Sequence, residues 1–324
     1  MSSMSRILMT GSTGFVGGAI TSLLTSKGHF ELINITRKPA PVNGASNHVV
    51  RDIATYDGWP ELLSGVDVVI HSAARVHVMS ETDPDPLAAF RAVNVEATLR
   101  LAKEAELAGA KRFIYISSIK VNGESTRPGV PFRADDVPSP QDPYGVSKME
   151  AEQALLKMSE SSAMDVVIIR PVLVYGPGVK ANFASMMNWL MTGVPLPLGL
   201  IKNKRSLVSS FNLAHLVLHC VDHPKASNKI FLVSDGEDLS TTQLLKKLKF
   251  FLDSHSLLLP IPEWLIKLCA SLIFRRDIAT RLCGSLQVDI SETIHLLGWT
   301  PPQTVDEGLG ITAKHFRSIK NKNK

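Results

Sequence analysis

Tyr144 and Lys148 are the residues of this sequence whose types and spacing point most directly to chemistry. They stand four positions apart in a stretch predicted to be helical, so both side chains would lie on one helix face. A free phenol, with a pKa near ~10, is a poor acid–base group at neutral pH, and a nearby ammonium lowers that pKa. The pair can then exchange a proton with an alcohol or a ketone. A chance pair on a helix surface has the same spacing, so the assignment depends on what accompanies it.

A serine hydroxyl accompanies the pair. Ser117 and Ser118 end a predicted strand over residues 112–118. A hydroxyl at a strand end, beside a cofactor, could hydrogen-bond the oxygen atom of a substrate. We therefore expect Ser118 to act together with Tyr144 and Lys148.

A glycine-rich loop provides the second sign of chemistry. Residues 10–18 read Thr-Gly-Ser-Thr-Gly-Phe-Val-Gly-Gly and join a predicted strand to a predicted helix. Glycine lets the backbone approach a pyrophosphate, whose charge then meets the N–H groups at the helix start. Three glycines alone are a weak signal, and a helix cap without a ligand is the alternative, but the strand–helix junction favours a dinucleotide site. The residues expected to contact it are Gly11, Thr13, Gly14, Phe15, Val16 and Gly17.

The ends of the second and third predicted strands bear on cofactor choice. An NAD-preferring site usually places an acid about 20 residues beyond the glycines, to hold the ribose 2′-hydroxyl. This sequence has Arg37 there and no acid, which favours a 2′-phosphate and hence NADP(H), with NAD as the possible alternative. A solvated basic loop would look the same. Asp52 and Ile53, after the third strand, are expected at the adenine edge, although Asp52 also fits an ordinary loop residue.

The elements that would position these residues alternate between strands and helices. Short apolar, β-branched runs predict strands over 6–10, 31–37, 48–52, 66–72, 112–118 and 165–171, and helical patterns cover 15–27, 86–108 and 144–161. Such alternation predicts an α/β fold with a doubly wound parallel (Rossmann) sheet. We expect a dinucleotide-binding domain over residues 1–175, which regains elements around 206–235. A smaller mixed α/β substrate lobe would cover residues 176–324 and end in a disordered basic tail, 318–324.

Composition narrows the class of protein. The chain has 324 residues, 44% hydrophobic and 20% charged, which excludes a disordered chain. Its net charge of +5 is small and lies largely in 314–324, so no nucleic-acid partner is expected. Three cysteines without metal-ligand spacing predict no metal site and a reduced, cytoplasmic protein.

Two segments need a check for membrane targeting. The first residues lack the apolar stretch of a signal peptide, so none is expected. Residues 257–274 are apolar but contain two prolines, a glutamate and a lysine, so we expect no spanning segment. A buried or interface helix from near Pro262 is expected there, and contact with a membrane surface is the alternative.

These motifs together resemble the extended short-chain dehydrogenase/reductases, over nearly the whole chain. The residues that carry the resemblance are 10–17, Asn94, Ser118, Tyr144, Lys148, His71-Ser72-Ala73-Ala74 and Arg170-Pro171 with Tyr175-Gly176-Pro177. The likeness is greatest to nucleotide-sugar epimerases and reductases of the UDP-glucose 4-epimerase type. It implies that Ser118 orients the substrate, Tyr144 transfers the proton, Lys148 also holds the nicotinamide ribose, and Asn94 supports the site. Ala73 is expected at the cofactor, and a homodimer through the helices near 86–108 and 144–161 is implied.

Departures from the family pattern narrow the expected reaction. The 4,6-dehydratases of the family place Asp-Glu after the counterpart of Ser118, whereas Ile119 and Lys120 stand here, so dehydration is not expected. With Arg37, this favours NADP(H)-dependent reduction at C4 of a UDP-linked 4-keto sugar, in the biosynthesis of cell-surface polysaccharide. The alternative is a UDP-glucose or UDP-N-acetylglucosamine 4-epimerase with bound NAD, and a further one is a steroid-type hydroxy dehydrogenase. A redox-sensing binding protein on the same fold would typically lack the tyrosine or the lysine.

Several polar residues are expected to hold the nucleotide sugar. Asn182, at a predicted helix start, could meet a diphosphate, and Arg205 could add charge-assisted bonds. Arg281 is a weaker candidate, and a solvated surface position is the alternative for both arginines. His77 lies just beyond the fourth strand, where it could line the sugar pocket or serve only as a structural hydrogen-bonding residue. Lys120 is also included among the substrate-binding residues.

Overall fold

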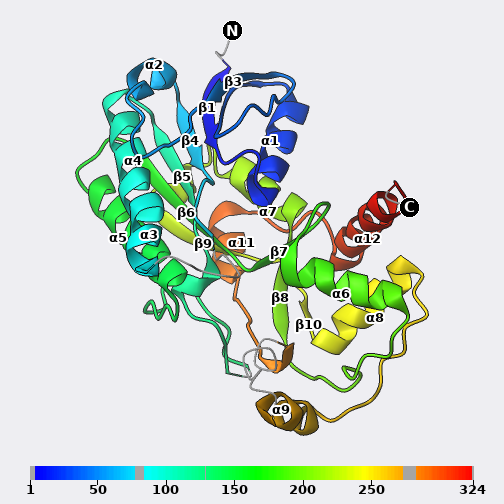
Figure 1. Cartoon of the computed structure of the whole chain (residues 1–324). Helices are drawn as coiled ribbons and strands as arrows, with labels where there is room; N and C mark the ends of the chain where they lie inside the picture. Colours follow the sequence, from blue (N-terminus) through cyan, green and yellow to red (C-terminus); the bar gives the residue numbers. More distant parts are fainter. Residues whose placement is uncertain (1–3, 77–83, 128, 273–281, 323–324) are drawn as a thin grey trace.

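The computed structural model describes residues 4–76, 84–127, 129–272 and 282–322. A large parallel sheet of seven strands lies at its centre, in the order β3-β2-β1-β4-β5-β6-β9 (Figure 1). These strands are β1 (Ser5–Thr10), β2 (Phe30–Thr36), β3 (Ala45–Val49), β4 (Val68–His71), β5 (Arg112–Ile116), β6 (Asp165–Pro171) and β9 (Lys229–Val233). The strand order reverses direction after β3-β2-β1, which confirms the predicted doubly wound sheet.

The helices alternate with these strands along the first half of the chain. They are α1 (Phe15–Lys27), α2 (Trp59–Leu63), α3 (Pro86–Arg91), α4 (Ala97–Leu107), α5 (Pro143–Ser159), α6 (Ala181–Thr192), α7 (Ser210–His219), α8 (Thr241–Leu252), α9 (Glu263–Leu272), α11 (Ser291–Leu297) and α12 (Val305–Lys322). A π-helical turn η1 (Ala92–Glu96) joins α3 to α4, and the 3-10 turns η2 (Ile119–Val121) and η3 (Pro224–Ala226) are short. The predicted helix over 86–108 is therefore one run with a π-helical interruption.

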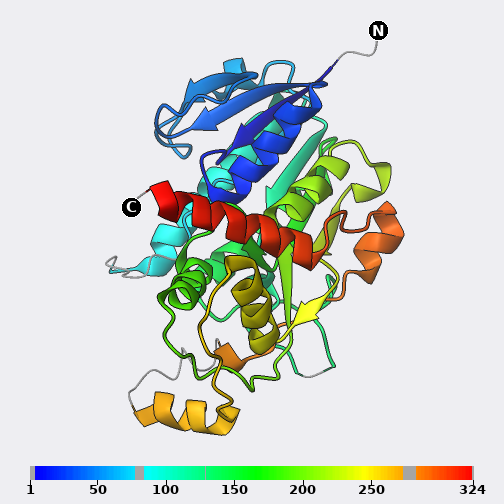
Figure 2. The ribbon, with the colours of Figure 1, turned by 90° about the vertical axis from the view of Figure 1, so that its right-hand side faces the viewer.

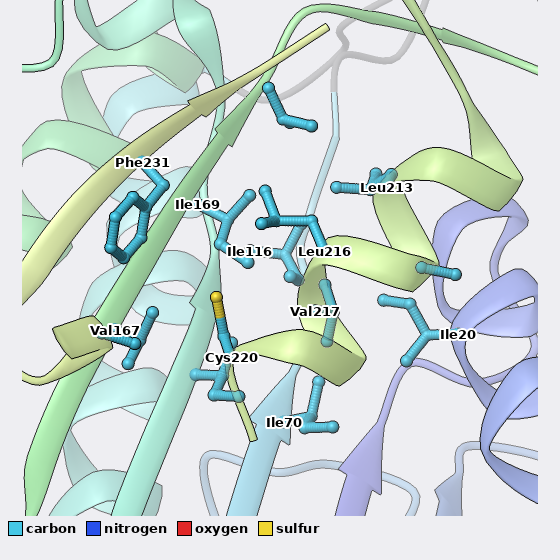
Figure 3. Packing of buried hydrophobic residues seen from close by; sticks show 14 of the residues in the cluster. Ile20, Ile70, Ile116, Val167, Ile169, Leu213, Leu216, Val217, Cys220 and Phe231 are labelled. Atoms are coloured by element: carbon cyan, nitrogen blue, oxygen red, sulfur yellow. The ribbon is translucent and has the colours of Figure 1, made fainter. Parts of the chain in front are cut away.

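Two apolar layers cover the two faces of the large sheet because side chains alternate along each strand. Ile7 and Met9 of β1 face the layer formed by α1 and α7, whereas Leu8 faces the layer formed by α2, α4 and α5. Figure 3 shows Leu213, Leu216 and Val217 of α7 directed towards the sheet. This packing holds the carboxyl ends of β1, β4 and β5 beside one another.

A second, smaller sheet forms the base of the C-terminal lobe. β7 (Leu173–Tyr175) pairs in parallel with β8 (Arg205–Ser209), and β10 (Asp238–Leu239) pairs antiparallel with β8. Helices α6, α8 and α12 enclose a separate apolar core that includes Tyr175, Phe183 and Leu245 (Figure 2). This smaller mixed sheet agrees with the predicted α/β lobe.

Two sequence predictions are wrong in detail. The third strand was expected at 48–52, but its pairing runs from Leu32↔Ala45 to Thr36↔Val49, so Asp52 lies three residues beyond the strand. Residues 318–322, expected to be disordered, continue α12. Val305, Leu309 and Ala313 anchor that helix in the lobe core, and further turns then cost little to add.

The segment considered for membrane contact contains α9, which begins one residue after Pro262. Within the described ranges, every helix is too short or too polar to cross a bilayer. Trp264 in α9 is 65% exposed, so this face of the helix is not buried against the lobe.

Candidate active site

The glycine-rich loop closes tightly between β1 and α1. Gly11 has φ of 76°, and a Cβ atom there would lie 2.6 Å from the backbone nitrogen of Ala73. A Cβ atom on Gly17 would lie 2.1 Å from the carbonyl oxygen of Gly11. Only glycine fits at either position, because the neighbours are backbone atoms that cannot swing away. The loop is therefore a tight turn that packs against the backbone at Ala73.

The loop also leaves polar groups available for a dinucleotide. Gly14 caps α1 without a side-chain hydrogen bond, so the first N–H groups of α1 have no capping oxygen. Within the described residues, the buried hydroxyl of Ser12 has no hydrogen-bond partner. An anionic pyrophosphate at this helix start would satisfy such donors, so the residues present fit a bound NAD(P). Ala73, predicted at the cofactor, lies against Gly11.

Gly17→Ala is expected to abolish dinucleotide binding. The new methyl group would force the backbone at Gly11 to shift, at a cost of about 1–3 kcal/mol in stability, and would disturb the cradle. Fluorescence titration with NADH and with NADPH measures the loss. Gly18→Ala is the matched control, because its Cβ atom would lie 3.3 Å from the nearest atom, the carbonyl oxygen of Ser12. Equal binding by both variants would contradict the expectation.

The residues predicted to contact the adenosine part of the cofactor lie in the loops after β2 and β3. Arg37 follows β2, is exposed, and makes no ion pair with another described residue. The carboxylate of Asp52 accepts hydrogen bonds from Ala54 N at 2.9 Å and from the Thr55 hydroxyl at 3.3 Å. Asp52 is thus engaged in a local turn, as its alternative interpretation held. Ile53 is half-buried and packs against the sheet layer of α2 and α4.

Ser118 and Tyr144 meet where β5 and α5 approach each other. The Ser118 hydroxyl lies close enough to the Tyr144 phenol to lower its pKa, and Lys148 Nζ lies 6.0 Å from the centroid of the Tyr144 ring. Lys148 Nζ is also 4.3 Å from the centroid of Tyr115, whose ring stacks on His71. The structure therefore brings the three predicted catalytic side chains together.

The same contacts connect this group to the glycine loop. His71 Nδ1 and the Thr10 hydroxyl are 2.7 Å apart, and Thr10 directly precedes Gly11. His71 Nε2 lies 3.0 Å from the Thr98 hydroxyl, and burial lowers the pKa of His71 to about 3. A neutral imidazole with a hydrogen bond at each ring nitrogen thus connects the end of β4 to the end of β1. The cluster of Ser118, Tyr144 and Lys148 is therefore connected through Tyr115 and His71 to the glycine-rich loop.

The pKa of Tyr144 is raised in the structure, whereas the sequence predicted that the nearby Lys148 lowers it. Burial raises its pKa, the Asp142 carboxylate raises it further, and the Ser118 hydrogen bond acts in the opposite direction. Lys148 does not bond the phenol, since its Nζ donates to the backbone oxygen of Ile116 at 2.8 Å, and burial lowers the Lys148 pKa to about 7. The protein groups alone keep Tyr144 protonated at neutral pH. A positive charge beside its ring would lower its pKa.

The buried side chain of Asn94 is hydrogen-bonded on both sides. Its side-chain oxygen accepts from Arg75 N at 2.8 Å, and its amide donates to Arg75 O and to the Ser147 hydroxyl, both at 3.0 Å. Ser147 in turn donates to the carbonyl oxygen of Tyr144 at 2.8 Å. Asn94 lies in the π-helical turn η1, a feature frequent at functional sites. Its hydrogen bonds connect the backbone at Arg75 to the start of α5.

Lys120 has protein partners rather than a free ammonium. It forms hydrogen-bonded ion pairs with Asp142 and, at 2.8 Å, with Glu124. Burial would lower the pKa of Lys120, but the two carboxylates outweigh it and leave the pKa raised. Asp142 also caps α5 by accepting from Gly145 N at 2.7 Å. Lys120 therefore links the turn after Ser118 to the start of the helix that carries Tyr144.

Lys120→Met and Asp142→Asn are expected to move the pH profile of turnover in opposite directions. When Tyr144 acts as a base, activity rises with pH as its phenol ionises. Without Lys120, the Asp142 charge is less neutralised and the Tyr144 pKa rises, so the profile moves to higher pH, on the order of one unit. Asp142→Asn removes that charge, lowers the pKa and moves the profile down.

Helix capping and the remaining charges provide the controls for this pair. Asparagine caps helices as well as aspartate does, so Asp142→Asn keeps the start of α5. Lys148 and Tyr115, which also face Tyr144, are unchanged in both variants. Lys120→Arg is expected to restore the wild-type profile. Shifts in the same direction would show that the variants merely disturb the helix start.

A buried ion pair behind Tyr144 was not singled out from the sequence. Glu152 follows Lys148 by one further turn of α5 and bonds Arg170 at 2.6 Å, with both side chains 2% exposed. Arg170 also donates to the side-chain oxygen of Asn122 at 2.9 Å. The recurrence of polar residues at 144, 148 and 152, beside the Arg170-Pro171 motif, was the available signal. The partners of Lys148 and Glu152 are 18 or more residues away along the chain, so the spacing of residues within one helix does not reveal them.

Asn182 and Arg205, two of the residues predicted to hold the nucleotide sugar, lie in different elements of the C-terminal lobe. Asn182 is exposed in the first turn of α6, after Ala181, which has a positive φ of 51°. Arg205 is half-buried at the start of β8 and donates to the carbonyl oxygen of Gly284 at 3.2 Å. His77 and Arg281 lie outside the described residues. No group of metal-ligating side chains occurs in the parts of the chain that are described.

Residues 7–234 match the model of the NAD dependent epimerase/dehydratase family. A protein of Vibrio cholerae named UDP-glucose 4-epimerase is 49% identical over 317 residues, which cover 98% of this chain and 97% of that protein.

Solved structures show the same fold at lower identity. A UDP-glucuronic acid 4-epimerase from Bacillus cereus, in complex with NAD, has a TM-score of 0.78 at 18% identity and covers 97% of this chain and 99% of its own. A structure of RMD from Pseudomonas aeruginosa, complexed with NADPH, has a TM-score of 0.73 at 23% identity and the same coverage of both chains. These two likenesses establish the fold.

Proposed function

The chain belongs to the NAD dependent epimerase/dehydratase family, and from that membership we propose that it is a UDP-sugar 4-epimerase that uses NAD. UDP-glucose or UDP-N-acetylglucosamine would be the substrate. The observation that carries the proposal is the 49% identity to the Vibrio cholerae protein over almost the whole of both chains. This identity favours the epimerase, the alternative prediction from the sequence, over the C4 reductase, which was the first prediction.

The residues of this chain divide the work of a 4-epimerase between them. Bound NAD supplies the chemistry of accepting a hydride from the sugar and returning it. Tyr144 takes the proton of the C4 hydroxyl and later gives it back, and Ser118 hydrogen-bonds the same oxygen. Lys148, whose pKa is lowered to about 7 by burial, supplies an ammonium near the phenol. The opposite sugar face must be presented before the hydride returns, so the substrate lobe must allow the 4-keto sugar to turn.

Arg37 favours a second candidate, the NADP(H)-dependent C4 reductase. It is exposed at the end of β2, where no acid is present to hold a ribose 2′-hydroxyl. An arginine at this point suits a 2′-phosphate. Reduction would use the same three residues. The hydride would go to the keto carbon, and Tyr144 would protonate the oxygen on that carbon.

The nucleotide carried by the purified protein distinguishes the two. Its absorbance and mass are expected to identify tightly held NAD, and the protein is expected to interconvert UDP-glucose and its C4 epimer without added nucleotide. A panel of UDP-sugars and UDP-4-keto sugars with NADPH or NAD⁺ then defines the substrate. Protein that carries no NAD, and consumes NADPH only with a 4-keto sugar, would establish the reductase instead.

A further inference from the structure

Six large apolar side chains are exposed at the outer end of the substrate lobe. They are Val194, Leu200, Leu257, Leu259, Trp264 and Leu268, each 39–65% exposed, and we call them the outer patch. Single exposed apolar residues are common on soluble proteins, but a group of this size marks an interaction site. None of the six belongs to the candidate active site.

Backbone hydrogen bonds hold the loop residues of the outer patch side by side. Leu196 N donates to Leu257 O, Leu259 N donates to Leu196 O, and Gly199 N donates to Leu259 O, all at 2.8 Å. These bonds join the segment after α6 to the segment before α9. Leu200 and Val194 therefore lie beside Leu257 and Leu259.

Helix α9 extends the patch outward. Trp264 and Leu268 are four positions apart and thus share one helix face, whereas Ile266 packs against the lobe core. Figures 1 and 2 both show α9 at the end of the molecule opposite β3, set apart from the other helices. An amphipathic helix with an exposed tryptophan and leucine is typical of a helix that lies in a membrane interface.

Lysines are the charged residues within the two loops of the outer patch. The segments 194–204 and 254–262 contain no acidic residue, and they contribute the exposed Lys202 and Lys204. Asp253 and Glu263, on either side of the second segment, are the acids next to them. Lysines beside exposed apolar side chains complement anionic lipid headgroups.

From this arrangement, we propose that the outer patch docks onto a membrane surface that contains anionic lipids. Two loops and a projecting helix can enter a bilayer interface together, because lipid adapts to an uneven apolar surface. Docking would hold the lobe at the membrane beside Arg205, which directly follows Lys204. It requires nothing of the active site, so it stands or falls separately from the proposed function.

Vesicle binding by the full chain tests the proposal. The wild-type protein is expected to sediment with vesicles of phosphatidylglycerol and phosphatidylcholine in equal parts, and less with phosphatidylcholine alone. Added salt should weaken the binding because it screens the lysines. Trp264→Ser combined with Leu268→Ser is expected to reduce binding about tenfold or more, since two interfacial anchors are lost. Its turnover of substrate in solution should equal that of the wild type.

Two controls make the result specific to the patch. Leu107→Ser removes an exposed leucine from α4, which lies far from α9 in Figure 1, and should leave vesicle binding unchanged. In a Trp189→Phe background, Trp59 and Trp299 are buried, so quenching by brominated lipid reports on Trp264. Wild-type protein that stays in the supernatant would overturn the proposal, as would equal binding by the double variant. Concentration-dependent self-association lost in the double variant, without lipid binding, would assign the patch to a second copy of this chain.

Discussion

Tyr144→Phe is expected to lower kcat by about 10²–10⁴-fold, because the change removes the hydroxyl that we propose moves the proton of the substrate. The phenyl ring keeps its edge contact with Phe90, whose centroid lies 6.0 Å away, so the fold should be unaffected. Lys148 also keeps its hydrogen bond to Ile116 O. Steady-state turnover, together with titration of the dinucleotide, should show a loss of rate with binding retained.

The two neighbouring serines offer a matched pair of controls for this result. Ser118→Ala removes the hydroxyl that lowers the Tyr144 pKa and is expected to lower kcat by about tenfold or more. Ser117→Ala removes a buried hydroxyl that has no hydrogen-bond partner among the described residues, so it should behave as wild type. Full turnover by Tyr144→Phe would remove the proposed mechanism for both the epimerase and the reductase.

Glu152→Ala is expected to cost about 3–5 kcal/mol of the free energy of unfolding, the largest stability effect we anticipate. The variant leaves the Arg170 guanidinium buried without the carboxylate that accepts three of its hydrogen bonds. Because Glu152 also raises the pKa of Lys148, the Lys148 ammonium should lose its proton more readily. Denaturant unfolding, followed by circular dichroism, measures the cost.

A double variant separates the lost charge partner from the lost packing. Glu152→Met with Arg170→Met replaces both charges by apolar groups of similar length and is expected to recover part of the lost stability. The side-chain oxygen of Asn122 would still lose its donor, so recovery should be incomplete. A single variant that costs less than about 1 kcal/mol would show that water reaches the arginine.

The sequence was sufficient wherever the physics is local. The spacing of Gly11, Gly14 and Gly17 predicted a close backbone turn, and the structure has that turn because no Cβ atom fits at Gly11 or Gly17. Tyr144 and Lys148 lie on one face of α5 because a helix brings positions four apart together. Apolar runs predicted the parallel strands, since both faces of the sheet are covered.

The sequence did not predict contacts between segments that are distant along the chain. Lys120 pairs with Asp142, which is 22 residues away. The buried Glu152–Arg170 pair and the position of the Lys148 ammonium, bonded to Ile116 O, likewise depend on how α5 packs against β5 and β6.

The sequence by itself determined the fold class, the tight glycine turn and the shared helix face of Tyr144 and Lys148, because each follows from periodicity or spacing along the chain. Only the tertiary structure decided the acidity of Tyr144, the role of Lys120 and the exposure of Trp264 on α9. Burial and charge–charge distance set those properties, and both depend on which segments the folded chain brings into contact.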